Sequence, residues 1–219
     1  MSSEKKQKTA LSELAFDSVR YVELLGKIMG VSESLQNNPA QGLYPKEDLC
    51  SDHVLAALAP YSGPDGPLKV ERIAFLEGRG NVIITYPGAT DASVAFVGSH
   101  MDVVPANPET WKRDPFKLTV EGDELHGRGA TDCLGHVALI TEMMIELATK
   151  RPVLQRTVTA VLIANEENGV RPTAASHALR TPRPRQRPAH ARAGDTHVHC
   201  ARTRQRHAHV RASARCTPP

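Results

Sequence analysis

Val97-Gly98-Ser99-His100-Met101-Asp102 is the stretch around which the rest of this chain is organised. It continues an apolar run that begins at Ser93 and has the length and composition of a buried strand. We expect this strand to end at Gly98-Ser99 and to deliver His100 and Asp102 at its carboxyl end. Residues two apart on an extended chain point the same way, so the imidazole could bind a metal while the carboxylate orients it. For this pair taken alone, a metal-free histidine bonded to a neighbouring carboxylate is the alternative.

The overall composition is that of one globular domain, but the charge is unevenly divided. The 219 residues carry a net charge of +3, whereas residues 171–219 hold eleven Arg, no Lys and one acid, Asp195. Because this segment contains no Ile, Phe, Tyr or Trp, it cannot bury enough apolar surface to offset its ordering entropy. We predict a disordered Arg/His/Pro/Ala-rich tail whose composition is that of a shifted reading frame. Nucleic-acid binding by this tail is the alternative, disfavoured because no aromatic residues interleave the arginines.

The location of the protein follows from its cysteines and its apolar runs. Four cysteines show no paired spacing and no signal peptide precedes them, so we expect a reducing, cytoplasmic compartment. No apolar run approaches the ~20 residues that a bilayer-spanning helix needs, which predicts no membrane partner. Residues 1–10 are polar and charged and are expected to form a flexible N-terminus.

The hydrophobic pattern predicts an α/β fold with helices packed on a mixed sheet over residues 11–170. Helices are expected over residues 11–29, 46–58 and 134–149, strands over 69–76, 81–86, 93–97 and 157–164, and a short hairpin within 116–125. The alternating pattern of the first strand places it near an edge. The nearly all-apolar segment 157–164 should be a central buried strand. Ligands of such sheets bind at the carboxyl ends of the strands.

Acidic and imidazole side chains follow a strand or hairpin at three places: His100 with Asp102, Asp132, and Glu166-Glu167. Each has a structural alternative, since Asp132 could cap the helix that follows and the glutamates could be a solvated loop end; His126 and His136 are taken as structural. Acids directly after an apolar strand are costly unless a cation offsets their charge. Together the three segments predict a metal site, and imidazole plus carboxylate suits zinc, with cobalt or manganese also possible.

Three motifs in the same order resemble one known family. They are Ser99–Pro105, Gly127–Gly135 and Asn165–Asn168, and they resemble the two-zinc metallopeptidase and amidohydrolase family that includes acetylornithine deacetylases, aminoacylases and succinyl-diaminopimelate desuccinylases. The resemblance covers about residues 11–169. The resemblance is greatest to the acetylornithine deacetylase branch, because of the sequence of residues 131–136 and of the Asn-Pro-x-x-Trp loop at residues 107–111.

The resemblance implies a truncated zinc-peptidase-like catalytic domain with two zinc ions and assigns roles to single residues. His100 would ligate one zinc and Asp102 would orient it; Asp132 would bridge the ions and Glu167 would ligate the second. Glu166 would be the general base. The implied substrate is a small N-acyl amino acid, N-acetylornithine, with a dipeptidase or aminoacylase activity as the alternative. Family members often dimerise, but their lid domain and remaining ligands are not evident here, so we predict impaired activity.

Overall fold

The computed structural model describes residues 14–169, so the predicted flexible N-terminus and basic tail lie outside the described residues. The helices are α2 (Ser18–Met29), α3 (Asp48–Leu58) and α4 (Leu134–Lys150). The strands are β1 (Lys69–Ala74), β2 (Gly80–Tyr86), β3 (Ser93–His100), β4 (Thr119–Glu121), β5 (Glu124–His126) and β6 (Thr157–Ile163). Every helix and strand predicted in this range is present, with shifts at the ends.

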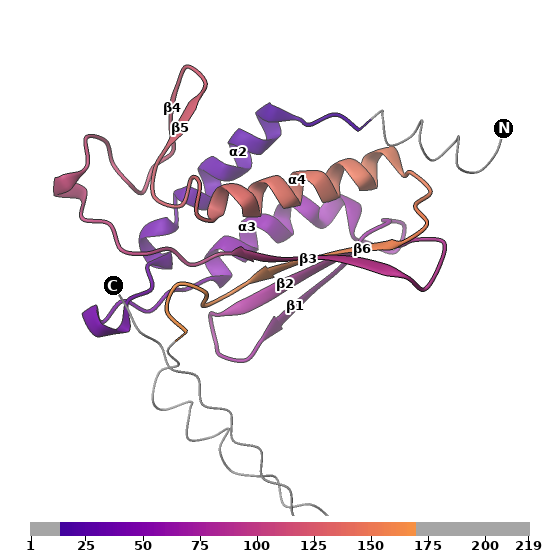
Figure 1. The fold of residues 1–219 in the computed structure, drawn as a ribbon, viewed down its shortest axis with the longest axis horizontal. Coiled ribbons are helices and arrows are strands. Elements are labelled where there is room, and N and C mark those ends of the chain that lie inside the picture. The colour runs from indigo at the N-terminus through magenta and orange to yellow at the C-terminus, as the bar shows by residue number, and fades with distance from the viewer. Residues whose placement is uncertain (1–13, 170–219) are drawn as a thin grey trace, which may run out of the picture. The chain divides into compact units, whose positions relative to one another are not determined.

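The predicted α/β fold with a mixed sheet is confirmed. The main sheet has the strand order β1-β2-β6-β3; β1 and β2 pair antiparallel, β2 and β6 pair antiparallel, and β6 pairs parallel with β3. β1 is therefore an edge strand and β6 a central one, as the sequence predicts. β4 and β5 form a separate hairpin that projects away from the sheet (Figure 1).

All three described helices lie on one side of the sheet (Figure 1). α3 and α4 contact the sheet directly, and α2 packs on both of these helices. The core between these layers is apolar and fully buried, with Leu25, Val54, Ile84, Met144 and Leu162 among its members. α2 is also tied to α4 by polar contacts, since Arg20 donates to Glu142 and to Glu146.

The expectation that residues 93–97 form a buried strand is wrong for the described part of the chain. β3 is the last strand of the described sheet, and its residues Ser93 to Gly98 are exposed. Val97 is 67% exposed, and Ile73 on the opposite edge strand is 41% exposed. The run is apolar enough for burial, but no described segment covers its outer edge or the face of the sheet opposite to the helices.

Two predicted element ends differ from the structure for local reasons. α2 begins at Ser18 rather than at residue 11, because the Asp17 side chain caps it by accepting a hydrogen bond from the Arg20 amide. β3 does not end at Gly98-Ser99 but continues to His100. A bulge between Val97 and Ser99 lets the strand continue, and Gly98 there has a φ of 119°, which glycine adopts without strain.

No helix among the described residues is both long and apolar enough to cross a bilayer.

Candidate metal centre

His100 is placed by the parallel pairing of β3 with β6. Its partner in the register is Ile163, the last residue of β6, and the Met101 amide donates to the Ile163 carbonyl at 3.0 Å. Because parallel strands end at the same edge of a sheet, the loop that carries Glu166 and Glu167 begins beside His100. The predicted meeting of these two segments at the carboxyl edge is what the structure shows.

The His100 imidazole is buried between carboxylates. Its Nδ1 lies 3.0 Å from the backbone oxygen of Asp102 and 3.6 Å from Asp102 Oδ1. Its Nε2 lies 2.9 Å from Asp132 Oδ1 and 3.6 Å from Glu166 Oε2. Burial would lower the His100 pKa, but hydrogen bonds to Asp102 and Asp132 outweigh it and raise the pKa to about 9. The ring is thus oriented by one nitrogen and presents the other to the acids.

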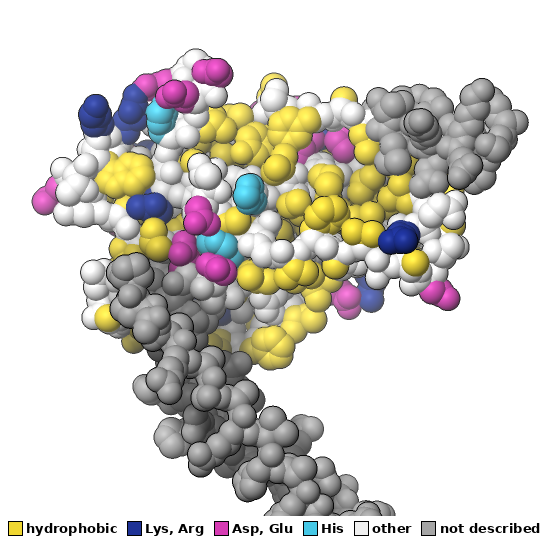
Figure 2. All heavy atoms as spheres, in the orientation of Figure 1, with side chains coloured by type: hydrophobic (Ala, Val, Ile, Leu, Met, Phe, Trp, Pro, Cys, Tyr) yellow, Lys and Arg dark blue, Asp and Glu magenta, His cyan; other side chains and the backbone are white. Residues whose placement is uncertain are grey.

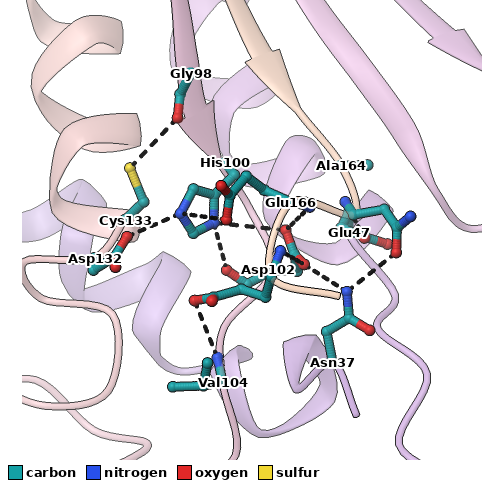
Figure 3. A network of polar contacts seen from close by, with 12 residues as sticks. Asn37, Glu47, Gly98, His100, Asp102, Val104, Asp132, Cys133, Ala164 and Glu166 are labelled. Carbon is teal, nitrogen blue, oxygen red and sulfur yellow. Dashed lines mark hydrogen bonds and ion pairs between the residues drawn. The ribbon is translucent and has the colours of Figure 1, made fainter. Parts of the chain in front are cut away.

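Asp102 is fully buried and organises the loop after β6. Its Oδ1 accepts the Glu166 amide at 3.0 Å, and its Oδ2 accepts the Glu167 amide at 3.0 Å and Asn37 Nδ2 at 2.6 Å. Burial alone would raise the pKa of Asp102, but these hydrogen bonds and the one with His100 lower it below its ordinary value. The Asp102 carboxylate therefore contacts His100 and also accepts hydrogen bonds from the backbone amides of Glu166 and Glu167. Figure 3 shows Asp102 beside His100 and Glu166.

Asp132 points into the open side of this site. It is 77% exposed along its side chain, although its Oδ1 contacts His100. It does not cap α4, because Cys133 occupies the N-cap position and gives no side-chain hydrogen bond. His100, Asp132 and Cys133 form the group of possible metal ligands among the described residues, with ligand atoms within 4.8 Å of one another. The Cys133 sulfur also lies 3.5 Å from His136 Nδ1.

The two glutamates differ in their surroundings. Glu166 is exposed and its carboxylate faces His100, whereas Glu167 Oε1 accepts the Val104 amide at 3.3 Å. Burial raises the pKa of Glu167; His100 opposes this effect, and the nearby Asp132 and Asp102 carboxylates add to it. Figure 2 shows acidic side chains gathered around a histidine on this face of the molecule.

Four further residues support this site: Asn37, Glu47 and Arg79, which sequence reasoning missed, and Asn165, which it placed in the third motif without assigning a role. Asn37 Nδ2 contacts both Asp102 and, at 3.1 Å, Asn165 Oδ1. Glu47 and Arg79 form a buried ion pair that contacts Asn165. Asn165 is the first residue of the glutamate motif, and this position is the signal that could have indicated its role. The other three are far from all three motifs in the sequence and share no pattern with them.

A cavity of about 450 Å³ lies beside the segment that precedes Asp132. Trp111, Arg113, His126 and Thr131 are among its lining residues. The Arg128 guanidinium stacks on the Trp111 ring, 5.2 Å from its centroid, and joins the Trp111 loop to the Asp132 loop. His126 thus lines a cavity but lies outside the group formed by His100, Asp132 and Cys133, and the interpretation of His126 as structural remains a prediction.

The donor chemistry of the site fits a divalent cation. Four carboxylates, those of Asp102, Asp132, Glu166 and Glu167, surround a single imidazole. Repulsion among the acids is relieved by positive charge, and imidazole with carboxylate oxygen is a set that zinc, cobalt and manganese accept. His100 Nε2 and the exposed Asp132 carboxylate already converge, so they could hold an ion without a change of fold.

These features define a class of protein, an α/β domain with an acidic, imidazole-containing site at the carboxyl edge of a mixed sheet. The chain belongs to peptidase family M20/M25/M40, whose characteristic sequence matches residues 96–205. The match includes His100, Asp132 and the glutamate pair, and it runs past the described residues into the segment that we predict to be a basic tail. This family consists of metal-dependent hydrolases, in agreement with the donor set described above.

Two curated relatives are acetylornithine deacetylases. The one from Arabidopsis thaliana is 52% identical over 157 residues, which cover 70% of this chain and 36% of the relative. The one from Dictyostelium discoideum is 48% identical over 162 residues, which cover 69% of this chain and 36% of the relative. A succinyl-diaminopimelate desuccinylase from a Methylobacterium strain is 38% identical over 81 residues, covering 36% and 20%. The chain therefore spans about a third of the length of the deacetylases.

Solved structures support the fold. Human carnosine dipeptidase 1 matches with a TM-score of 0.54 at 21% identity, over 81% of this chain and 37% of that one. The dipeptidase Dug1p from Saccharomyces cerevisiae matches with a TM-score of 0.53 at 16% identity, over 77% and 36%. At these identities the likeness concerns the fold alone.

Proposed function

We propose that the protein hydrolyses the amide bond of an N-acyl amino acid, with N-acetylornithine as the substrate and acetate and ornithine as products. The observation that carries this proposal is the convergence of the His100 imidazole with the Asp132 and Glu166 carboxylates beside Asp102. The choice of substrate rests on the likeness to the two acetylornithine deacetylases. The cavity beside Asp132 offers space for a small molecule.

Each residue has a separate task in this proposal. His100, Asp132 and Glu167 are the metal ligands. The full site holds two zinc ions, and cobalt or manganese can replace zinc. Asp102 orients His100 and fixes the loop. The bound metal supplies Lewis-acid activation of water and of the scissile carbonyl. Glu166, exposed and beside the ring, accepts a proton from the attacking water and passes it to the leaving amine as the carbon–nitrogen bond breaks.

We further propose that this chain of 219 residues is a weak catalyst by itself. The described residues contribute one buried imidazole to the site. A metal site with fewer protein ligands loses affinity and defined geometry. A reducing compartment such as the cytoplasm fits the free thiols of Cys50 and Cys133.

The experiment is a hydrolysis assay on the purified chain after loading with zinc, with N-acetylornithine as substrate and Glu166→Gln as the matched variant. We expect the chain to bind zinc at near-stoichiometric levels only at high metal concentration. We also expect slow release of ornithine, which the Glu166→Gln substitution abolishes. A panel with a dipeptide and other N-acyl amino acids separates the alternative dipeptidase or aminoacylase activity. Hydrolysis that is unchanged in Glu166→Gln would contradict the assignment of the base.

The alternative of nucleic-acid binding concerns residues 171–219, which lie outside the described residues. It is tested by comparing the RNA affinity of the chain with that of a chain ending at Val170. Affinity that survives this deletion and does not fall with salt removes the tail from that hypothesis.

A further inference from the structure

A buried ion pair far from the three motifs contacts the loop that carries the glutamates. Glu47 lies directly before α3, and Arg79 lies in the turn between β1 and β2. Arg79 Nη2 donates to Glu47 Oε1 at 2.7 Å and Arg79 Nε donates to Oε2 at 2.9 Å, in a two-point arrangement. The side chains are 9% and 0% exposed. Burying two charges is expensive, so such a pair is better explained by a positioning task than by a gain in stability.

Both members of the ion pair also form a hydrogen bond with Asn165. Glu47 Oε1 accepts the Asn165 amide at 3.0 Å, and Arg79 Nη2 donates to Asn165 Oδ1 at 2.9 Å. Asn37 Nδ2 donates to the same Oδ1 at 3.1 Å. Asn165 is therefore held through both its backbone and its side chain. In Figure 3, Asn37 and Glu47 lie on one side of Asp102, and Asp132 and Cys133 lie on the other.

Asn165 needs this support because its backbone is in the left-handed region. Its φ is 63°, a conformation that asparagine tolerates better than most residues. This turn directs the next two amides, those of Glu166 and Glu167, onto the two oxygens of Asp102. The direction in which both glutamates leave β6 is thus set at Asn165, and Glu47 and Arg79 hold Asn165 in place.

We infer that Glu47 and Arg79 are positioning residues for the glutamate loop, so that metal binding at this site depends on an ion pair outside the site itself. The inference rests on the proposed function for its metal, but its structural content, the ordering of the Glu166 and Glu167 amides, is independent of any metal. The alternative is that the pair only anchors α3 to the turn between β1 and β2.

The experiment compares three variants of the full chain. Asn165→Gly keeps the left-handed turn and the ion pair but removes the acceptor of Arg79. Glu47→Gln keeps an oxygen for the Asn165 amide but removes the charge. Glu142→Gln is the control, because Glu142 is also buried and also pairs with an arginine, Arg20, but joins α2 to α4. Hydrogen exchange of the Glu166 and Glu167 amides and zinc affinity by calorimetry are measured for each, with the unfolding free energy as reference.

We expect the two loop variants to lose at least tenfold in protection at both amides and at least tenfold in zinc affinity. Glu142→Gln should keep the wild-type amide protection and zinc affinity, while its unfolding free energy decreases. Wild-type protection in Asn165→Gly and Glu47→Gln overturns the inference, whatever the metal does. If the wild-type chain binds no zinc, the proposed function fails, and the exchange data still decide the inference. Should Glu47→Gln not fold, Asn165→Gly alone decides it.

Discussion

Asn37 Nδ2 lies 2.6 Å from Asp102 Oδ2, in a hydrogen bond between two buried residues that are 65 positions apart. The Asn37 amide also donates to the Val103 carbonyl at 2.8 Å, so both the backbone and the side chain of Asn37 contact the segment after β3. Among the described residues Asn37 Oδ1 has no hydrogen-bond partner. The side chain is therefore placed to serve Asp102 and Asn165 through its nitrogen.

Replacing Asn37 by Ala should weaken metal binding and reduce stability together. Asp102 would lose a donor while staying buried, which costs about 1–3 kcal/mol of unfolding free energy. Loss of an outer hydrogen-bond partner of this kind typically lowers metal affinity about 10–100-fold. Urea unfolding and calorimetric zinc titration measure the two effects. Asn38→Ala, at the neighbouring half-exposed position, should leave zinc affinity unchanged, and an equal loss in both variants would contradict the assigned role.

Metal affinity should rise with pH because a proton and a metal compete for His100 Nε2. The pKa of His100 in the metal-free chain is raised to about 9, so the ring is protonated at neutral pH and binding must release that proton. We expect zinc affinity to increase about tenfold per pH unit below the pKa and to level off above it. Calorimetry in buffers of different ionisation enthalpy counts the proton released.

The exposed His136 offers a matched control for this pH dependence. His136→Asn should keep the slope of zinc affinity with pH, whereas His100→Asn should lose most of the binding itself. A flat pH profile in the wild-type chain contradicts the competition.

Cys133 should not ligate the metal, although its sulfur belongs to the same group of possible ligands. The sulfur approaches His136 Nδ1 at 3.5 Å and the Gly98 carbonyl at 4.0 Å, and Figure 3 shows it directed toward Gly98. The cobalt-loaded protein should therefore show no thiolate-to-cobalt charge-transfer band. Cys133→Ser should change cobalt affinity less than about threefold, well below the loss expected for an outer partner of a true ligand. A band that disappears in Cys133→Ser would falsify this prediction and add a sulfur ligand to the site.

The two faces of the sheet should respond differently to the loss of an isoleucine. Ile84 on β2 is fully buried against the helices, and Ile84→Ala should cost about 2–5 kcal/mol of unfolding free energy through lost burial and a cavity. Ile73 on β1 is 41% exposed on the uncovered face, and Ile73→Ala should cost less than about 1.5 kcal/mol. Denaturant unfolding of the two variants measures the difference; equal costs would mean that this face is covered in solution.

The outer edge of β3, which no segment within residues 14–169 covers, should cause self-association of the chain. Residues 93–97 carry no charge, and Val94, Phe96 and Val97 are exposed there. Uncharged, exposed edge strands pair with other chains, and a lysine on the edge prevents this. Sedimentation velocity should show concentration-dependent association that Val97→Lys reduces. Val153→Lys is the control, since Val153 is 68% exposed but lies between α4 and β6; a monomer at all concentrations contradicts the prediction.

The order and type of the secondary-structure elements could be predicted from sequence because they depend on local periodicity. The alternation in residues 69–76, the apolar run before Asn165 and the amphipathic pattern before Lys150 identify their elements without tertiary information. The three motifs likewise identify His100, Asp132 and the glutamate pair, because the residues of each motif are close together in the chain. That the segments after β3 and β6 meet follows from the rule for carboxyl ends of strands. The position of Asp132, which follows the separate β4–β5 hairpin, does not follow from that rule.

Only the tertiary structure decided which residues hold this site in position and which strand is left uncovered. Asn37, Glu47 and Arg79 reach the glutamate loop across separations of up to 128 residues, and no local pattern records a hydrogen bond between distant segments. The exposure of β3 depends on what lies beside it rather than on its own apolar residues. Local patterns therefore determine the elements and the reactive side chains, and packing determines their supports and their surroundings.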